Sequence, residues 1–169
     1  TLHLPREGRL VAKKLTDYSL SFYASRSYLT QKTRPETIDD LRDHLLVSYV
    51  SNLLYSPSLD YSEVGKIDAG YVLECASAIG QMEIVRSGGG VGILHDFAAT
   101  GYPELVRVLP TIRFLRAYWL VVHADVHGLN RIRRVESFIF DEVQSRRRQF
   151  SALLEPVRDR DEESGPESC

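Results

Sequence analysis

The stretch ASAIGQMEIVRSGGGVGILHDFAA, residues 76–99, decides how this chain folds. Ser77 stands where a helix would begin, and serine is a favoured N-cap because its hydroxyl accepts a hydrogen bond from a free backbone N–H. Apolar residues then recur at helical spacing as far as Val85, and the glycines at 88–90 can supply the positive φ that ends a helix. The apolar run at 91–94 is typical of a strand covered on both faces. The stretch therefore predicts one helix-then-strand step of an α/β sheet.

Further strand and helix patterns flank this step in alternation, which favours an α/β architecture. Period-two alternation predicts strands, whereas a one-sided apolar stripe predicts a helix. The last helix carries its charged residues on the face opposite the stripe. We predict strands at 10–15 and 19–24 joined by a polar turn at 16–18, a short helix at 27–31, a helix at 37–44 opened by a variant capping box of Thr37 and Asp40, strands at 45–50, 67–73, 105–109 and 118–123, a surface loop at 51–66, and a final helix with Ile132, Val135, Phe138, Ile139 and Val143.

Composition narrows the class of protein. The 169 residues are 43% hydrophobic with a formal net charge of −2, as in a globular protein that does not itself bind DNA. No apolar run approaches the roughly 20 residues that span a bilayer, and the first residues lack a signal-peptide pattern, so we expect a cytoplasmic protein without a membrane partner. Cys75 and Cys169 are expected to be reduced thiols. Residues 151–169 are predicted to be a disordered tail, because the composition from Glu155 onward cannot bury a core.

The sequence shows no catalytic or metal-binding arrangement. The glycines at 88–90 follow a helix, whereas phosphate-binding glycines precede one, and no G-x-S-x-G elbow is present. His123 and His127 are four residues apart but straddle a strand end and a turn, which is a poor metal spacing. We therefore predict no enzyme activity, no metal and no cofactor. What remains is ligand binding where Ser77 begins a helix at the carboxyl edge of the sheet; the alternative is that Ser77 only caps its helix.

Five stretches within about residues 9–145 carry the most specific pattern: LVAKKLTDYSLSFYASRSYL (10–29), RPETIDDLRDH (34–44), ASAIGQMEIVRSGGGVGILHDFAA (76–99), PELVRVLP (103–110) and YWLVVHADVHGLNRIRRVESFIFDEV (118–143). Taken together, they resemble the effector-binding domain of LysR-type transcriptional regulators. The resemblance implies an α/β fold of the periplasmic-binding-protein-like type 2, with two lobes and a small-molecule cleft between them. It places residues 1–25 and 109–150 in lobe I and residues 26–108 in lobe II. The first lobe would be incomplete, because the family's opening βα units of that lobe are not among the 169 residues. The family's winged helix-turn-helix and linker helix are not among them either. The resemblance covers most of the chain, about residues 9–145.

The same resemblance implies a function and a site. The chain would be the effector-sensing domain of a transcription regulator that forms a homodimer or homotetramer and reaches DNA only through its N-terminal domain. The effector would be a small molecule, with carboxylates as a candidate class. The candidate effector-binding residues are Ala76, Ser77 and Ala78 at the helix start, His95 after the strand, and Ala24 and Ser25 at the crossing between lobes.

Two positions depart from the family's usual pattern, and two other classes of function stay open. The family commonly has proline where this chain has His95 and Arg26, so the effector chemistry is expected to differ from familiar examples. A solute-binding protein of a transport system would share the fold but would need an export signal. An enzyme built on an α/β sheet is the third class, and the missing acid, base and nucleophile signatures weigh against it.

Overall fold

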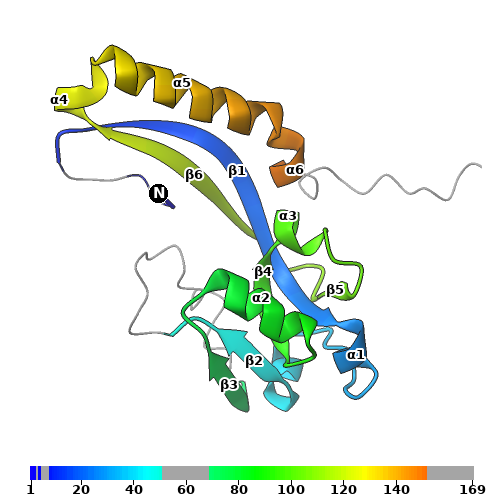
Figure 1. Cartoon of the computed structure of the whole chain (residues 1–169). Coiled ribbons are helices and arrows are strands. Elements are labelled where there is room, and N and C mark those ends of the chain that lie inside the picture. The colour runs from blue at the N-terminus through cyan, green and yellow to red at the C-terminus, as the bar shows by residue number, and fades with distance from the viewer. Residues whose placement is uncertain (3, 5–7, 51–68, 152–169) are drawn as a thin grey trace, which may run out of the picture.

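One long strand, β1 (Leu10–Ser25), runs through the whole molecule (Figure 1). Its first part pairs antiparallel with β6 (Phe114–His123), as far as Leu20. Its last part lies between β4 (Val91–His95) and β5 (Leu105–Val108), again antiparallel. β1 therefore joins two parts of the fold. The structure is a computed structural model that describes residues 1–2, 4, 8–50 and 69–151.

Two parallel strands extend the sheet beyond β4. β2 (Leu45–Ser48) pairs parallel with β4 on one side and with β3 (Tyr71–Glu74) on the other. The resulting order is β3-β2-β4-β1-β5, with β6 on the far part of β1. Because β2, β3 and β4 run in the same direction, their carboxyl ends meet at one edge of the sheet.

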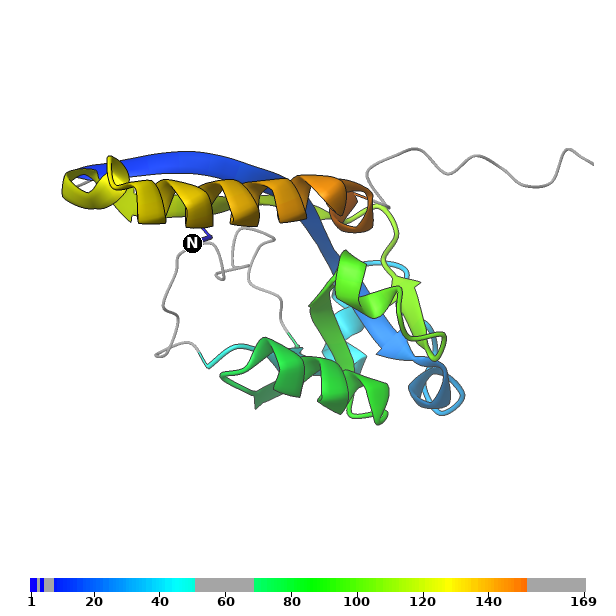
Figure 2. The same ribbon diagram turned by 45° about the horizontal axis from the view of Figure 1, so that its top comes forward.

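α2 packs on one face of the sheet, α5 lies over the β1–β6 pair, and short helices lie at strand ends. α2 connects β3 to β4, which confirms the helix-then-strand step predicted from residues 76–99. Figures 1 and 2 show α5 running along the β1–β6 pair, and α6 turning back from it toward α3. The helices are α1 (Arg26–Leu29), the 3-10 helix η1 (Asp39–Asp43), α2 (Ala78–Arg86), α3 (Asp96–Ala99), α4 (Ala124–His127), α5 (Asn130–Ser145) and α6 (Arg147–Ser151).

The buried core has two clusters, which β1 separates. Alternate residues of a strand point to opposite faces, so β1 contributes to both. One cluster includes Tyr18, Leu20 and Phe22. The other includes Tyr23 together with Val85 of α2. The crossing strand is thus covered on both faces over its second half.

The structure corrects the predicted break in the first strand. Residues 16–18 do not form a turn: Thr16, Asp17 and Tyr18 pair with Tyr118, Ala117 and Arg116 of β6. A register shift between Lys14 and Thr16 accommodates the polar stretch without ending the strand. The turn prediction was wrong because the partner that holds these residues extended lies about a hundred residues further along the chain.

Other boundaries also differ from the predicted ones. The predicted helix at 37–44 is only the 3-10 helix η1, and half of the capping box forms: the Asp40 carboxylate accepts the Thr37 N–H at 2.8 Å, but no side chain caps the start. β2 ends two residues early, and β6 begins four residues before the predicted start. The predicted loop at 51–66, the start of the strand at 67–73 and the tail after 151 lie outside the described residues.

Candidate functional site

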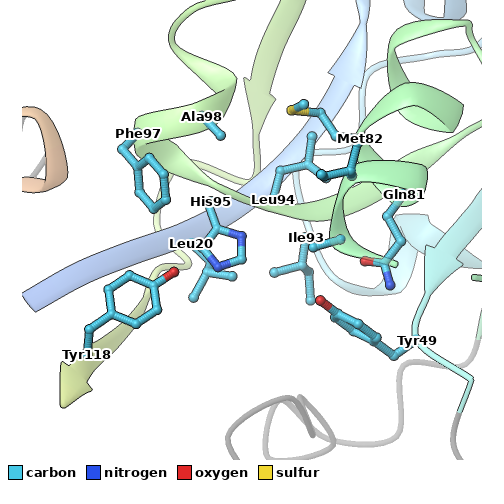
Figure 3. Close-up of a pocket in the computed structure, with 12 residues that line it drawn as sticks. Leu20, Tyr49, Gln81, Met82, Ile93, Leu94, His95, Phe97, Ala98 and Tyr118 are labelled. Carbon is cyan, nitrogen blue, oxygen red and sulfur yellow. The ribbon is translucent and has the colours of Figure 1, made fainter. Parts of the chain in front are cut away.

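A cavity of about 230 Å³ opens at the carboxyl ends of β2 and β4 (Figure 3). Ligands of open α/β sheets bind at this edge. α2 and α3 form two of its walls, and residues from β1, β4 and β6, together with Tyr49 directly after β2, form the rest. The lining residues are Leu20, Tyr49, Ala78, Ile79, Gln81, Met82, Ile93, Leu94, His95, Phe97, Ala98 and Tyr118.

His95, the last residue of β4, stands in the aromatic part of this wall. Its imidazole stacks on Tyr18, with ring centroids 5.3 Å apart and planes 17° apart, and meets the edge of Phe97 at 5.4 Å. Tyr118 belongs to the same aromatic part of the wall. Its ring also stacks on Tyr18, with the ring centroids 4.2 Å apart. Burial lowers the pKa of His95, while the nearby Asp96 charge opposes the shift. The imidazole is therefore neutral at pH 7.

The imidazole nitrogens of His95 have no hydrogen-bond partner in the described part of the chain. The other described histidines differ. His44 is bonded to the Tyr28 hydroxyl at 3.0 Å, and His127 to Glu136 at 3.1 Å. His123 accepts a bond from a backbone N–H. A half-buried imidazole that faces a cavity with one donor and one acceptor unused is a group that a ligand can contact.

The start of α2 borders the same cavity. The Ser77 hydroxyl accepts the Gly80 N–H at 3.3 Å, as predicted for an N-cap. The N–H groups of Ala78 and Ile79 have no acceptor within the helix, because the first turn of any helix lacks one. Gln81 is 2% exposed and donates its side-chain N–H to the carbonyl of Cys75 at 2.8 Å, which fixes the turn that leads into the helix.

A buried acid holds the junction between β4 and α3. Asp96 is 2% exposed, and its carboxylate accepts hydrogen bonds from three β1 hydroxyls: Ser19, Ser21 at 3.2 Å and Tyr23 at 2.8 Å. Burial, and then the Asp96 charge, raise the pKa of the Tyr23 phenol far above its usual value. Because Asp96 directly follows His95, this network fixes the place from which the imidazole enters the cavity.

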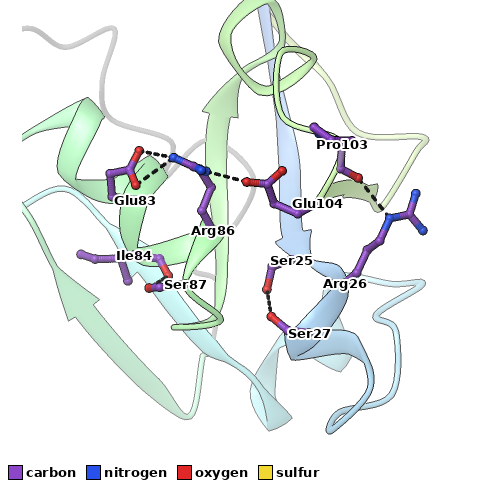
Figure 4. Close-up of polar contacts among 9 residues, drawn as sticks. All are labelled: Ser25, Arg26, Ser27, Glu83, Ile84, Arg86, Ser87, Pro103 and Glu104. Carbon is purple, nitrogen blue, oxygen red and sulfur yellow. Dashed lines mark hydrogen bonds and ion pairs between the residues drawn. The ribbon is translucent and has the colours of Figure 1, made fainter.

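The opposite end of α2 is tied down by ion pairs (Figure 4). Arg86 binds Glu83 at 2.7 Å and Glu104 at 2.9 Å, so the helix is joined to the start of β5. Arg26, the second departure from the family pattern, donates to the carbonyl of Pro103 at 3.1 Å. Arg26 is therefore engaged at this end of the sheet and does not line the cavity, in contrast to His95.

The structure brings together two of the six candidate residues. Ala78 and His95 line the cavity, and Ala76 and Ser77 are exposed immediately before Ala78. Their part in effector binding stays a prediction.

The other two candidates lie elsewhere. Ala24 is 0% exposed and pairs with Val91, at the far end of β4 from His95. Ser25 is 1% exposed and caps α1, where its hydroxyl accepts the Tyr28 N–H at 3.2 Å and bonds to Ser27 (Figure 4). Pairing of β1 with β6 gives way to pairing with β4 at Leu20, several residues before Ala24. Effector contact by Ala24 and Ser25 also stays a prediction, and the site proposed below omits them.

Sequence reasoning did not single out four polar or flexible members of the wall. Tyr49 and Tyr118 come from segments that only tertiary packing brings to His95, and no local pattern marks them. Gln81 and Met82 lie on the predicted helix, one turn from its start, so helical spacing from Ala78 could have found them.

The described residues contain no group of three or more metal-ligating side chains. No helix within the described ranges has the length and apolar character to cross a membrane.

The comparison with known families identifies the class of protein. The LysR substrate binding domain family matches residues 1–144, which is most of the chain, so the chain belongs to that family. It is an effector-binding regulatory domain of a LysR-type transcriptional regulator. The family consists of non-enzymatic regulators, which confirms that the protein is not an enzyme. No curated protein sequence matches the chain.

Solved structures of regulatory domains share the fold. The CrgA regulatory domain from Neisseria meningitidis is 21% identical with a TM-score of 0.67, over 84% of this chain and 72% of that one. The Synechocystis CcmR regulatory domain, solved in complex with 2-PG, is 15% identical with a TM-score of 0.65, over 85% and 72%. Full-length AphB from Vibrio cholerae is 18% identical with a TM-score of 0.64, over 83% of this chain but 50% of that one. These likenesses confirm the periplasmic-binding-protein type 2 fold.

Proposed function

We propose that this domain senses a small effector bound in the cavity at the carboxyl ends of β2 and β4. The observation that carries the proposal is His95: a half-buried, neutral imidazole that faces the cavity without a hydrogen-bond partner among the described residues. The CcmR regulatory domain was solved with a small molecule bound, which supports a small effector for a domain of this fold. Ala76, Ser77 and Ala78 at the helix start complete the proposed site.

Binding would change the packing of two lobes. We assign residues 1–25 and 109–150 to lobe I and residues 26–108 to lobe II. Tyr118 and Leu20 then reach the cavity from lobe I, and the other lining residues from lobe II. An effector that contacts both sides stabilises one arrangement of the lobes, and only the difference in its affinity for the two arrangements shifts their populations.

A carboxylate is one candidate for the polar group of the effector. The N–H groups of Ala78 and Ile79 lack intrahelical acceptors and carry the positive end of the helix dipole. A single carboxylate placed there would accept hydrogen bonds from the backbone without needing a cationic side chain.

The signal would pass to DNA through an assembly of copies. We propose a cytoplasmic homodimer or homotetramer whose DNA contacts lie in a winged helix-turn-helix domain outside these 169 residues. The exposed edge strand β3, with Tyr71 75% exposed, is a surface that could pair with another copy. The solute-binding alternative shares the fold, but the match to the LysR family favours the regulator.

Calorimetry on variants of the full chain tests the site. Small carboxylates that raise the melting temperature are titrated into wild type and Ala78→Phe, whose ring fills the cavity, with Gly128→Ala as a remote control. The proposal expects Ala78→Phe to abolish binding and Gly128→Ala to leave it unchanged; equal binding by both would exclude the cavity. Ser77→Ala is titrated in the same series, and an affinity equal to that of wild type would remove Ser77 from the site.

A further inference from the structure

The cavity wall is mostly apolar and uncharged. None of its twelve lining residues carries a full charge at pH 7, given that His95 is neutral. Eight of the twelve residues have apolar side chains, and Met82 is one of these eight. The polar groups are the side chains of Tyr49, Gln81, His95 and Tyr118. A wall of this composition favours an apolar ligand body, because burial of apolar surface is what it can offer.

The four polar side chains differ in whether their hydrogen-bonding groups are already used within the protein. The Gln81 amide N–H is already donated to the Cys75 carbonyl. Tyr49 and Tyr118 have further interactions of their own. His95, in contrast, has both ring nitrogens without partners in the described chain. Figure 3 shows its imidazole facing the cavity between Tyr118 and Ile93. A ligand can therefore be oriented by one hydrogen bond to this ring.

The size of the cavity limits the ligand. Its volume of about 230 Å³ lies below the roughly 300–1,000 Å³ of pockets that hold drug-sized molecules. The rings of His95 and Tyr118 both stack on Tyr18, with interplanar angles of 17° and 14°, and both residues line the cavity. The space suits a body of about one six-membered ring.

On these grounds we propose that the effector is a small molecule with an apolar, single-ring-sized body and one hydrogen-bonding group that contacts His95. The inference rests on the proposed function and narrows its ligand class. It excludes hydrophilic dianions, since two buried charges would need cationic partners and the described lining residues include none. The start of α2 can offset one negative charge at most, so a ring-bearing monocarboxylate is compatible with the wall.

Three probes, titrated into the 169-residue chain, distinguish the contribution of an apolar ring to binding from the contribution of charge. Benzyl alcohol has the ring and one neutral hydroxyl, benzoate has the ring and one charge, and succinate has two charges without a ring. The inference expects both ring probes to bind at least about tenfold more tightly than succinate. His95→Phe keeps a ring on Tyr18 but removes the nitrogens, and should weaken benzyl alcohol binding about fivefold. His123→Phe is the matched control and should leave binding unchanged.

The outcomes distinguish the inference from the proposed function. Tighter binding of succinate than of either ring probe, with Ala78→Phe abolishing it, would overturn the ligand class and keep the site. Failure of both ring probes to bind at millimolar concentration would overturn the ligand class as well. Ring probes that bind Ala78→Phe as well as wild type would overturn the site itself. Equal effects of His95→Phe and His123→Phe would exclude His95 as the orienting group.

Discussion

At the scale of single residues, Asp96 is the side chain whose removal should lower the free energy of unfolding most. It accepts hydrogen bonds from Ser19, Ser21 and Tyr23 in a site from which water is excluded. Asp96→Ala would leave three buried hydroxyls without their acceptor, so we expect a loss of about 3 kcal/mol or more in the free energy of unfolding. Urea denaturation measures it. Tyr23→Phe, which removes one bond of the three, should cost about 1 kcal/mol, and equal losses in the two variants would contradict a shared network.

Two histidines make stability depend on pH. Burial lowers the pKa of His44, with the Lys32 charge adding to the shift, and burial also lowers the pKa of His95. Below the unfolded pKa of about 6.5 the unfolded chain binds protons that the folded chain resists, so this contribution is complete above about pH 6.5 and is lost as the pH falls. We expect wild type to lose more stability between about pH 7.5 and pH 5.5 than His95→Phe. Parallel urea midpoints across this range would contradict the prediction.

At the scale of elements, the junction between α2 and β4 depends on Gly90. Its φ is +141°, and a Cβ there would lie 2.3 Å from the Leu45 carbonyl oxygen. Gly90→Ala should therefore cost about 2 kcal/mol or more, through backbone strain and loss of the close approach to β2. Gly128→Ala is the matched control, because its φ is −72° and a Cβ there meets nothing within 4 Å. Thermal unfolding that gave both variants the same shift would contradict this account.

The same elements show what the sequence could predict and what it could not. The step from Ser77 to the strand of β4 is confirmed, because a cap, a helical stripe and glycines of positive φ are local signals. The continuous β1 was missed because its polar residues are held by β6, far along the chain. Ser19 and Ser21 look like an exposed polar face in sequence, but they are buried on Asp96. Both features depend on partners that are distant in the sequence, so local sequence patterns do not predict them.

The candidate site follows the same division. The strand-end position of His95 and the helix-start position of Ala78 can be read from sequence once the order of elements is known, and both line the cavity. Tyr118 and Tyr49 could not be predicted, since their places depend on how β6 and the end of β2 pack. The absence of charge from the wall is likewise a property of the folded chain.

At the scale of the whole molecule, Phe150 of α6 links the β1–β6 part to the cavity wall. Its ring lies 5.0 Å from Phe97 of α3 and 6.3 Å from Tyr118 of β6, measured between centroids. α6 directly follows α5, which lies over β1 and β6. A shift of this part relative to the cavity would therefore change the contact between Phe150 and Phe97. Phe150→Ala should lower the free energy of unfolding by about 2 kcal/mol, less than for a fully buried phenylalanine. It should also change the affinity of any ligand that contacts Phe97.

Phe138 of α5 supplies the matched control for this prediction. It is 68% exposed, so Phe138→Ala should change the free energy of unfolding by no more than about 0.5 kcal/mol and leave ligand affinity unaltered. Urea denaturation and benzoate titration of the two variants make the comparison. If Phe150→Ala behaved like Phe138→Ala in both measurements, α6 would contribute neither to stability nor to the cavity, and the prediction would be contradicted. A loss confined to Phe150→Ala would mean that the aromatic contacts around Phe97 couple the cavity to the helices that lie over β1 and β6.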